Sequence, residues 1–174
     1  MLPVRRLLQM WQWQPDGGKL FTPFVDGAAA HLMKQGKVQW LIVGSDRIAA
    51  NGDVANKIGT YNLAVVAQAN KVPFYVAAPT TTIDMATLTG DAIEIEERPV
   101  EEVTTIGTCQ ITPDDILVGN PAFDVTPAAL VTALITEQVA AVAGGDACRD
   151  IKARAATTCV KADVSIDRRL VDDF

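Results

Sequence analysis

A run of aliphatic residues that leads straight into a polar turn, over residues 38–59, constrains the fold of this chain more than any other stretch. The run at 38–43 is typical of a buried strand, and it delivers Asp46 just beyond its carboxyl end. The turn at 50–53 is rich in residues that tolerate tight backbone geometry, and helical spacing begins after it. In open α/β sheets, ligands bind outside the carboxyl ends of strands, near helix N-termini that attract anions. The sequence therefore predicts a ligand site at this edge of a sheet.

The residues after this turn predict a helix followed by a second strand. Four apolar side chains recur at helical spacing and predict one buried stripe: Val54, Ile58, Tyr61 and Val65. The helix they predict covers residues 54–70, and the apolar run at 74–78 predicts another buried strand. Two strands joined by a helix form a βαβ unit, so the strands should be parallel with a right-handed crossover. The predicted fold class is α/β, with a parallel sheet and flanking helices.

Other elements are predicted from shorter signals. Residues 26–35 predict a short helix that ends at a glycine, and the alternation over 93–99 predicts a short, half-exposed strand. Residues 100–122 are expected to form loop with short extended pieces. A further helix is expected with Thr126 at its N-cap and Pro127 at its first position. Its apolar face would carry Leu130, Val131, Leu134 and Ile135.

These signals divide the 174 residues, a one-domain length, into three parts. Residues 1–25 show little periodicity, residues 26–143 form the predicted α/β domain, and residues 144–174 are expected to be a loosely packed tail. With two arginines and no acidic residue before Asp16, the amino-terminal stretch leaves a transit peptide open. Its apolar run is too short and interrupted for a secretory signal.

Charge and composition exclude several classes of partner. A formal charge of −6 and a pI of about 4.7 argue against non-specific binding to nucleic acid or to an anionic membrane. No apolar run is long enough to span a bilayer. The cysteines, Cys109, Cys148 and Cys159, lack metal-like spacing, so we expect reduced thiols in a cytosolic protein. With His31 as the only histidine, expected on a helix surface or in the core, a metal cluster is not expected.

One acid, one amide and one ammonium group converge on the predicted strand edge, as Asp46, Asn56 and Lys57. Together they suggest a site for a small phosphorylated substrate, and we expect them to line one concave surface. Each also has a structural alternative. Asp46 fits a turn or a helix cap, and the other two fit the first turn of a helix. A lysine at a helix N-terminus opposes the helix dipole, however, which favours an anion-binding role.

Four further charged positions near this edge have structural explanations. Asp53 is expected to be an N-cap, because it directly precedes the helical stripe. Asp124 fits either a turn or cap or a pocket residue. Arg47 could pair with Asp46 or with a neighbouring subunit, and the sequence does not decide. The carboxylates between residues 94 and 97 are expected to lie on a solvated strand edge.

Four separate motifs resemble the methylthioribose-1-phosphate isomerase family. They are VGSDRIAANGDVANKIGTY at 43–61, VPFYVAAP at 72–79, IEERP at 95–99 and NPAFDVTP at 120–127. They occur in order and with family-like spacing across about residues 26–138. The wider family includes ribose-1,5-bisphosphate isomerases and the regulatory subunits of the translation-initiation guanine-nucleotide exchange factor.

The resemblance implies a Rossmann-like C-terminal domain and an aldose–ketose isomerase of methionine salvage, a route of amino-acid biosynthesis. Such an enzyme interconverts 5-methylthioribose 1-phosphate and 5-methylthioribulose 1-phosphate. Asp46 matches the family's proton donor, and Asn56 with Lys57 matches its substrate-binding pair. No cofactor is implied, and a cytoplasmic homodimer is expected, with a nuclear location also fitting a eukaryote.

The resemblance also defines what this sequence lacks. The family's N-terminal helical domain, with its Arg-Gly phosphate loop, has no counterpart here. Its catalytic cysteine lies upstream of the aspartate, and no cysteine precedes Asp46. We therefore expect little activity from this chain. The alternative function is that of an inactive dimerising module, as in the exchange-factor relatives.

Overall fold

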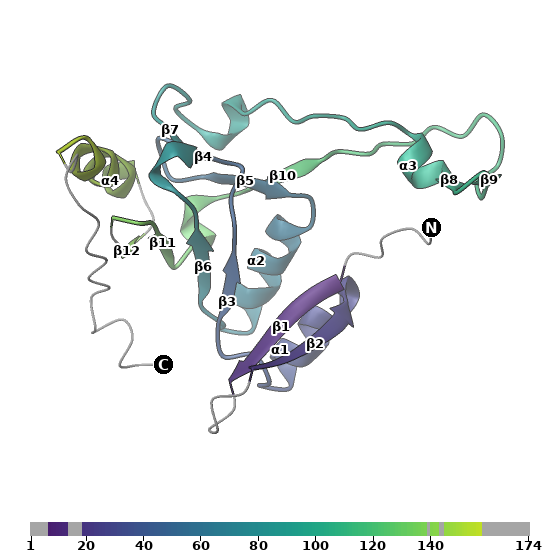
Figure 1. Ribbon diagram of the computed structural model, residues 1–174, viewed down its shortest axis with the longest axis horizontal. Helices are drawn as coiled ribbons and strands as arrows, with labels where there is room; N and C mark the ends of the chain where they lie inside the picture. The colour runs from purple at the N-terminus through teal and green to yellow at the C-terminus, as the bar shows by residue number, and fades with distance from the viewer. Residues whose placement is uncertain (1–6, 14–18, 139, 143–144, 158–174) are drawn as a thin grey trace.

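The structure is a computed structural model that describes residues 7–13, 19–138, 140–142 and 145–157 (Figure 1). Its α-helices are α1 (Ala29–Lys34), α2 (Thr60–Ala69), α3 (Glu101–Thr104) and α4 (Gly145–Thr157). Short 3₁₀ turns are η1 (Asp26–Ala28), η2 (Thr80–Thr82), η3 (Gly90–Ala92) and η4 (Ala128–Leu130). The strands are β1 (Leu7–Trp13), β2 (Lys19–Val25), β3 (Leu41–Val43), β4 (Arg47–Ala49), β5 (Val54–Lys57), β6 (Phe74–Ala77), β7 (Ile83–Asp84), β8 (Thr105–Ile106), β9 (Cys109–Gln110), β10 (Phe123–Thr126), β11 (Ala133–Ile135) and β12 (Ala140–Val142).

A parallel sheet forms the centre of the molecule, in the strand order β12-β11-β6-β3. Strand β3 pairs in parallel with β6, and β6 pairs in parallel with β11, while β12 is antiparallel. Strands β3 and β6, which lie within the runs at 38–43 and 74–78, are the parallel strands that the sequence predicts, with α2 between them along the chain. The predicted α/β class is confirmed.

The core lies on the sheet face that α1 and α2 cover. Alternate residues of the three parallel strands point into it, among them Leu41, Phe74, Val76 and Leu134. Ala64 and Ala67 of α2 are fully buried there. Because their side chains are small, the helix packs closely on the sheet.

A second sheet, in the order β10-β5-β4-β7, carries the polar turns that follow the parallel strands. Strands β4 and β5 form an antiparallel hairpin, and β10 adds to the other side of β5. The turn between β4 and β5 contains Gly52 with a φ of +91°, which favours glycine. This sheet has a small apolar cluster of its own, built on Ala49, Ala55 and Ile93.

The helix predicted over 54–70 is wrong in its first part. Residues 54–57 form β5, and α2 begins only at Thr60, after Gly59 with a φ of +101°. The predicted stripe is not a buried face either, because Tyr61 and Val65 are 45% and 40% exposed. Pairing of β5 with strands on both sides outweighs the helical spacing of its residues.

The helix predicted after Pro127 is also wrong. Thr126 ends β10 instead of capping a helix, and the chain makes only the short turn η4 before β11. Ala133–Ile135 then pairs in parallel with β6. By periodicity, a short apolar run fits a buried strand and a helix equally well. Here the run forms a strand because it pairs with the edge of β6 that β3 leaves open.

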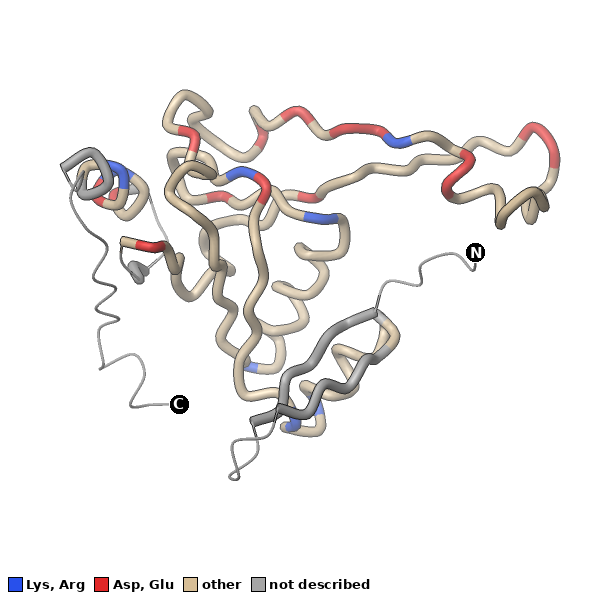
Figure 2. Tube along the Cα trace, in the orientation of Figure 1, with Lys and Arg blue, Asp and Glu red and all other residues tan. Residues whose placement is uncertain are grey.

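Residues 94–120 form a long projection, here called the acidic arm (Figure 1). The strand predicted over 93–99 is absent. An isolated bridge between Glu97 and Pro121, with a hydrogen bond from the Arg98 N–H to the Asn120 carbonyl at 3.0 Å, joins the two sides of the arm at its base. The arm carries seven acidic residues with Arg98 as its only basic one, so its net charge of −6 equals that of the whole chain. Figure 2 shows these acidic positions spread along it.

The two ends of the chain depart from their predictions within the described residues. Residues 7–13 and 19–25 pair as an antiparallel hairpin, where the sequence shows little periodicity. In the predicted loose tail, α4 places Cys148 and Ile151 in the core with no exposed surface. Residue 144 and residues 158–174 of that tail lie outside the described residues.

The Asp53 carboxylate joins three segments of the second sheet. One oxygen accepts the N–H of Ala128 at 2.9 Å, and the other accepts the N–H of Gly90 at 3.0 Å and the side-chain amide of Asn51 at 2.7 Å. The fit is close, since a Cβ on Gly90 would lie 2.5 Å from Cγ1 of Val125. Asp53 is thus a cap, as predicted, but for η3 and η4 and not for the helix that follows it.

We expect Asp53→Asn to destabilise the fold in a pH-dependent way. Burial raises the pKa of Asp53, but the bonds from Ala128, Asn51 and Gly90 outweigh it and hold the pKa below its usual value. The carboxylate therefore stabilises the fold above the unfolded pKa of about 3.9 and loses this effect as pH falls through its lowered value. In Asp53→Asn, the side-chain NH₂ group faces one of the backbone N–H groups that the carboxylate accepts. The unpaired N–H should lower the free energy of unfolding by about 2 kcal/mol at pH 7.

The measurement is chemical denaturation of both proteins from pH 7 to pH 3. The difference in unfolding free energy should shrink as pH falls. Asp91→Asn, at an exposed position beside Gly90, is the control and should change stability little. A wild-type advantage that stays constant over this range would contradict the ionic role of Asp53.

Candidate active site

Asp46 lies just beyond the carboxyl end of β3, in the bend that leads into β4. This bend is fastened to β5, because the Asp46 N–H donates to the carbonyl oxygen of Ala55 at 2.9 Å. The Ser45 hydroxyl donates to the same carbonyl at 3.2 Å. The Asp46 side chain is exposed, and no described residue forms a hydrogen bond or ion pair with its carboxylate. The backbone is fixed while the carboxylate is open to a ligand.

Asn56 and Lys57 are the last two residues of β5, not the first turn of a helix as predicted. Thr60, which the sequence analysis did not single out, links them. The side-chain amide of Asn56 donates to the Thr60 hydroxyl at 3.1 Å, and that hydroxyl donates to the Lys57 carbonyl at 2.7 Å. Thr60 is 5% exposed, so these bonds are shielded from water. The sequence signal that could have identified Thr60 is a threonine that follows a glycine at the start of a helix.

Asp124 lies opposite Asn56 in the pairing of β10 with β5. Its carboxylate oxygens accept the N–H groups of Gly59 at 2.6 Å and Tyr61 at 3.0 Å, which are the amides at the start of α2. Of the two alternatives for Asp124, the capping one is therefore observed. The helix N-terminus expected to attract a ligand anion already holds an internal one.

Asn56 and Lys57 leave β5 on opposite faces, because successive strand residues alternate. Lys57 lies opposite Phe123, and its ammonium nitrogen is 5.5 Å from the centre of that ring, within cation–π range. The expectation that both side chains line one concave surface with Asp46 is not met in this structure. Asp46 directly precedes β4 and Asn56 lies in the neighbouring strand β5, while Lys57 is exposed on the other face of β5.

The other polar candidates are accounted for elsewhere. Arg47 forms an ion pair with Asp84 at 3.8 Å, and among the described residues it makes none with Asp46. His31 shares a hydrogen bond with Gln35 on an exposed helix surface. Burial raises the pKa of the Cys148 thiol, which lies in the core. Within the described ranges, no cluster of His, Cys, Asp or Glu could hold a metal ion, and no helix is long and apolar enough to cross a membrane.

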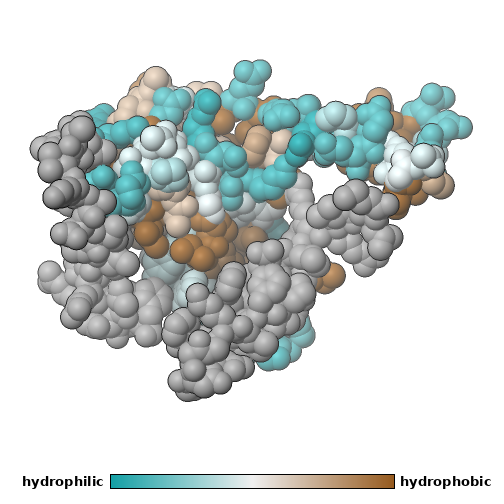
Figure 3. Space-filling model, in the orientation of Figure 1, coloured by the Kyte–Doolittle hydropathy of each residue, from teal (hydrophilic) through white to brown (hydrophobic). Residues whose placement is uncertain are grey.

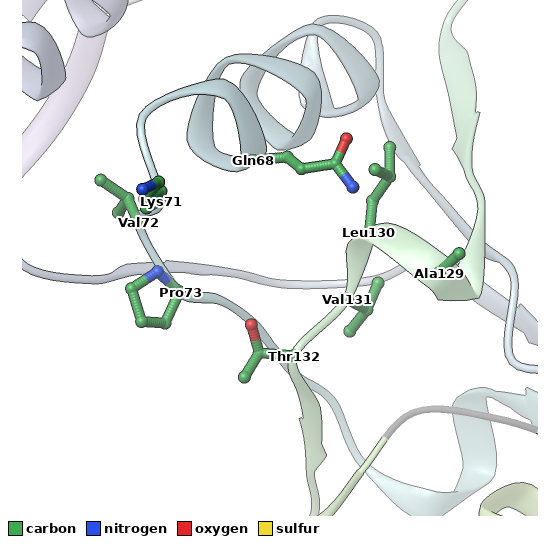
Figure 4. Close-up of a pocket in the computed structure, with 8 residues that line it drawn as sticks. All are labelled: Gln68, Lys71, Val72, Pro73, Ala129, Leu130, Val131 and Thr132. Atoms are coloured by element: carbon green, nitrogen blue, oxygen red, sulfur yellow. The ribbon is translucent and has the colours of Figure 1, made fainter.

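A cavity of about 300 Å³ lies away from these residues (Figure 4). It is lined by Gln68, Lys71, Val72, Pro73, Ala129, Leu130, Val131 and Thr132. These residues end α2 or directly precede β6 and β11, so the cavity is at the amino ends of the parallel strands. Asp46 lies at the opposite, carboxyl edge, and the cavity has no part in the candidate site.

This arrangement of a parallel sheet with polar residues at its carboxyl edge has known relatives. The sequence profile of the initiation factor 2 subunit family matches residues 20–140. The chain belongs to this family. Methylthioribose-1-phosphate isomerase of Herpetosiphon aurantiacus is 60% identical to it over 131 residues, which make up 75% of this chain and 37% of that protein.

Two solved structures of this family extend the comparison. The 5-methylthioribose 1-phosphate isomerase of Pyrococcus horikoshii is 48% identical, with a TM-score of 0.70, and the match covers 78% of this chain and 37% of that one. The translation initiation factor eIF-2B subunit delta of A. fulgidus is also 48% identical, with a TM-score of 0.63, over 67% of this chain and 34% of that one. This chain thus spans little more than a third of each relative's length. The resemblance drawn from the four motifs is confirmed at the level of the family.

Proposed function

We propose that this chain carries the acid and the substrate-binding pair of an aldose–ketose isomerase in methionine salvage. Its substrate would be 5-methylthioribose 1-phosphate and its product 5-methylthioribulose 1-phosphate. The observation that carries the proposal is Asp46, fastened to β5 beside Asn56 and Lys57, in a chain 60% identical over 131 residues to a methylthioribose-1-phosphate isomerase.

The chemistry gives each residue a separate task. C1 of the aldose carries the phosphate, so the ring must open without a free anomeric hydroxyl and needs an acid near the ring oxygen. Asp46 is that acid. To donate a proton, its carboxyl group must be kept neutral, which requires its removal from water. Because Asp46 is exposed here, bound substrate or sequence outside this chain must cover it. The Asn56 amide suits sugar hydroxyls, and the Lys57 ammonium suits the phosphate.

We expect weak or undetectable turnover from the 174-residue chain, because the family's upstream cysteine has no counterpart before Asp46. Loss of one positioned acid–base group typically costs roughly 10²–10⁴-fold. A coupled isomerase assay should compare this chain with a version extended by any upstream genomic sequence. Turnover by the short chain close to that of a complete enzyme would show that its own residues replace the upstream group.

Sugar-phosphate binding should remain and should depend on Lys57. Removing a charge-assisted contact with Lys57→Ala should weaken binding of 5-methylthioribose 1-phosphate roughly 10-fold or more, since such contacts contribute about 1.5–3 kcal/mol. Isothermal calorimetry measures the change, with Lys37→Ala as the control at another exposed lysine. Equal affinities for wild type and Lys57→Ala would remove the phosphate role from Lys57.

A second candidate function is that of a non-catalytic dimerising module. The match to translation initiation factor eIF-2B subunit delta of A. fulgidus, at 48% identity, favours it. So does the sheet face turned away from α1 and α2, where Ile42 of the edge strand β3 is 47% exposed. Figure 3 shows apolar side chains gathered over the middle of this view, where Figure 1 places β6. An apolar face beside an unpaired strand edge favours association.

We therefore expect a dimer at micromolar concentration, with either function. Light scattering coupled to gel filtration gives the mass directly. Ile42→Glu should shift the mass towards the monomer, because it places a charge on the edge strand. Leu88→Glu, at a position 71% exposed on another part of the surface, should leave the mass unchanged. A wild-type protein of monomer mass would overturn the expectation.

A further inference from the structure

The start of α2 cannot cap itself. Its N-cap residue is Gly59, which has no side chain to offer, and its first turn contains no acidic residue. A helix of ten residues with free N-terminal amides would normally bind water or an anion there. Here the Asp124 carboxylate, more than sixty positions along the chain, occupies the Gly59 and Tyr61 amides.

This remote cap fixes the segment that bears the candidate binding pair. Asn56 is held at one end by its pairing with Asp124 across β5 and β10. At the other end, the same Asp124 holds the first residues of α2, next to Thr60. Thr60 in turn bonds to the Asn56 amide and the Lys57 carbonyl. Asp124 therefore fastens the segment from 56 to 60 at both ends, through backbone strand pairing at Asn56 and through its carboxylate at Gly59 and Tyr61.

We propose that Asp124 is a positioning residue for the sugar-phosphate site, acting through Asn56 and Lys57 without touching the substrate. Since its carboxylate fills the start of α2, the substrate phosphate binds to Lys57 and not to the helix amides. This inference rests on the proposed function for its substrate, while the fastening of residues 56–60 stands on the structure alone.

The test measures binding of 5-methylthioribose 1-phosphate to the 174-residue chain by ¹H–¹⁵N NMR titration. Asp124→Asn should weaken binding roughly 10-fold, the effect of one charge-assisted hydrogen bond of about 1.5 kcal/mol. Asp150→Asn, at an exposed position on α4, is the matched control and should bind as wild type does. Tighter binding by Asp124→Asn would overturn the proposal, because it would place the carboxylate against the substrate anion.

A double-mutant cycle separates positioning from a general effect on folding. If Asp124 acts through Lys57, Asp124→Asn should weaken binding much less in a Lys57→Ala background than in wild type. Additive losses would overturn the proposal.

The NMR spectra also give a readout that needs no ligand. In Asp124→Asn, the Gly59 and Tyr61 amide signals and the Asn56 side-chain amide signals should move. The Gly90 and Ala128 amides, which bond to Asp53, should stay in place as a check on folding. If the wild-type chain binds no sugar phosphate, the proposed function fails. The amide signals alone then test whether Asp124 fastens residues 56–60. Unchanged Asn56 signals would overturn it.

Discussion

The antiparallel pairing of β5 with β10 is the constraint on which the rest of the second sheet and the candidate site depend. An acidic residue at the start of each strand caps the element that follows the other strand. Asp53 precedes β5 and bonds to Ala128, the first residue of η4 after β10. Asp124, in β10, bonds to the start of α2 after β5. The starts of η4 and α2 are capped only when the two strands are paired. Strand pairing, capping and the placement of Asn56 therefore arise together.

This reciprocal capping explains which parts of the fold follow from sequence. Asp53 was recognisable as a cap, because acidic residues before apolar runs favour that role, and a cap was one of the two alternatives for Asp124. Their targets were not recognisable, because each target lies across a strand pair and not along the chain. The local sequence pattern predicts that Asp53 caps a helix directly after it and that Thr126 caps a helix that begins at Pro127. Strand pairing overrides both predictions.

The parallel strands were predictable because they are uninterrupted apolar runs at 41–43 and 74–77, as strands of a parallel sheet usually are. β5 and β11 were not, because the residues of β5 share a helical spacing with those that follow and the apolar run at β11 fits a strand or a helix equally well. For the site, the rule that ligands bind at strand carboxyl ends brings Asp46 and Asn56 to adjoining strands. It does not give the face on which each side chain leaves, and so it misplaces Lys57.

Binding and catalysis make different demands on this edge. Orientation of a sugar phosphate needs only fixed donors, and the β5–β10 pair together with Thr60 of α2 fixes Asn56 and the Lys57 backbone. Acid catalysis needs a low-dielectric environment, in which charges and protons are not shared with bulk water. Asp46 and Lys57 are both exposed, so under the proposed function this chain would supply the orientation and not the enclosure. If sequence beyond this third of a family member's length provides the cover, adding it should raise turnover far more than affinity, because the donors are already in place.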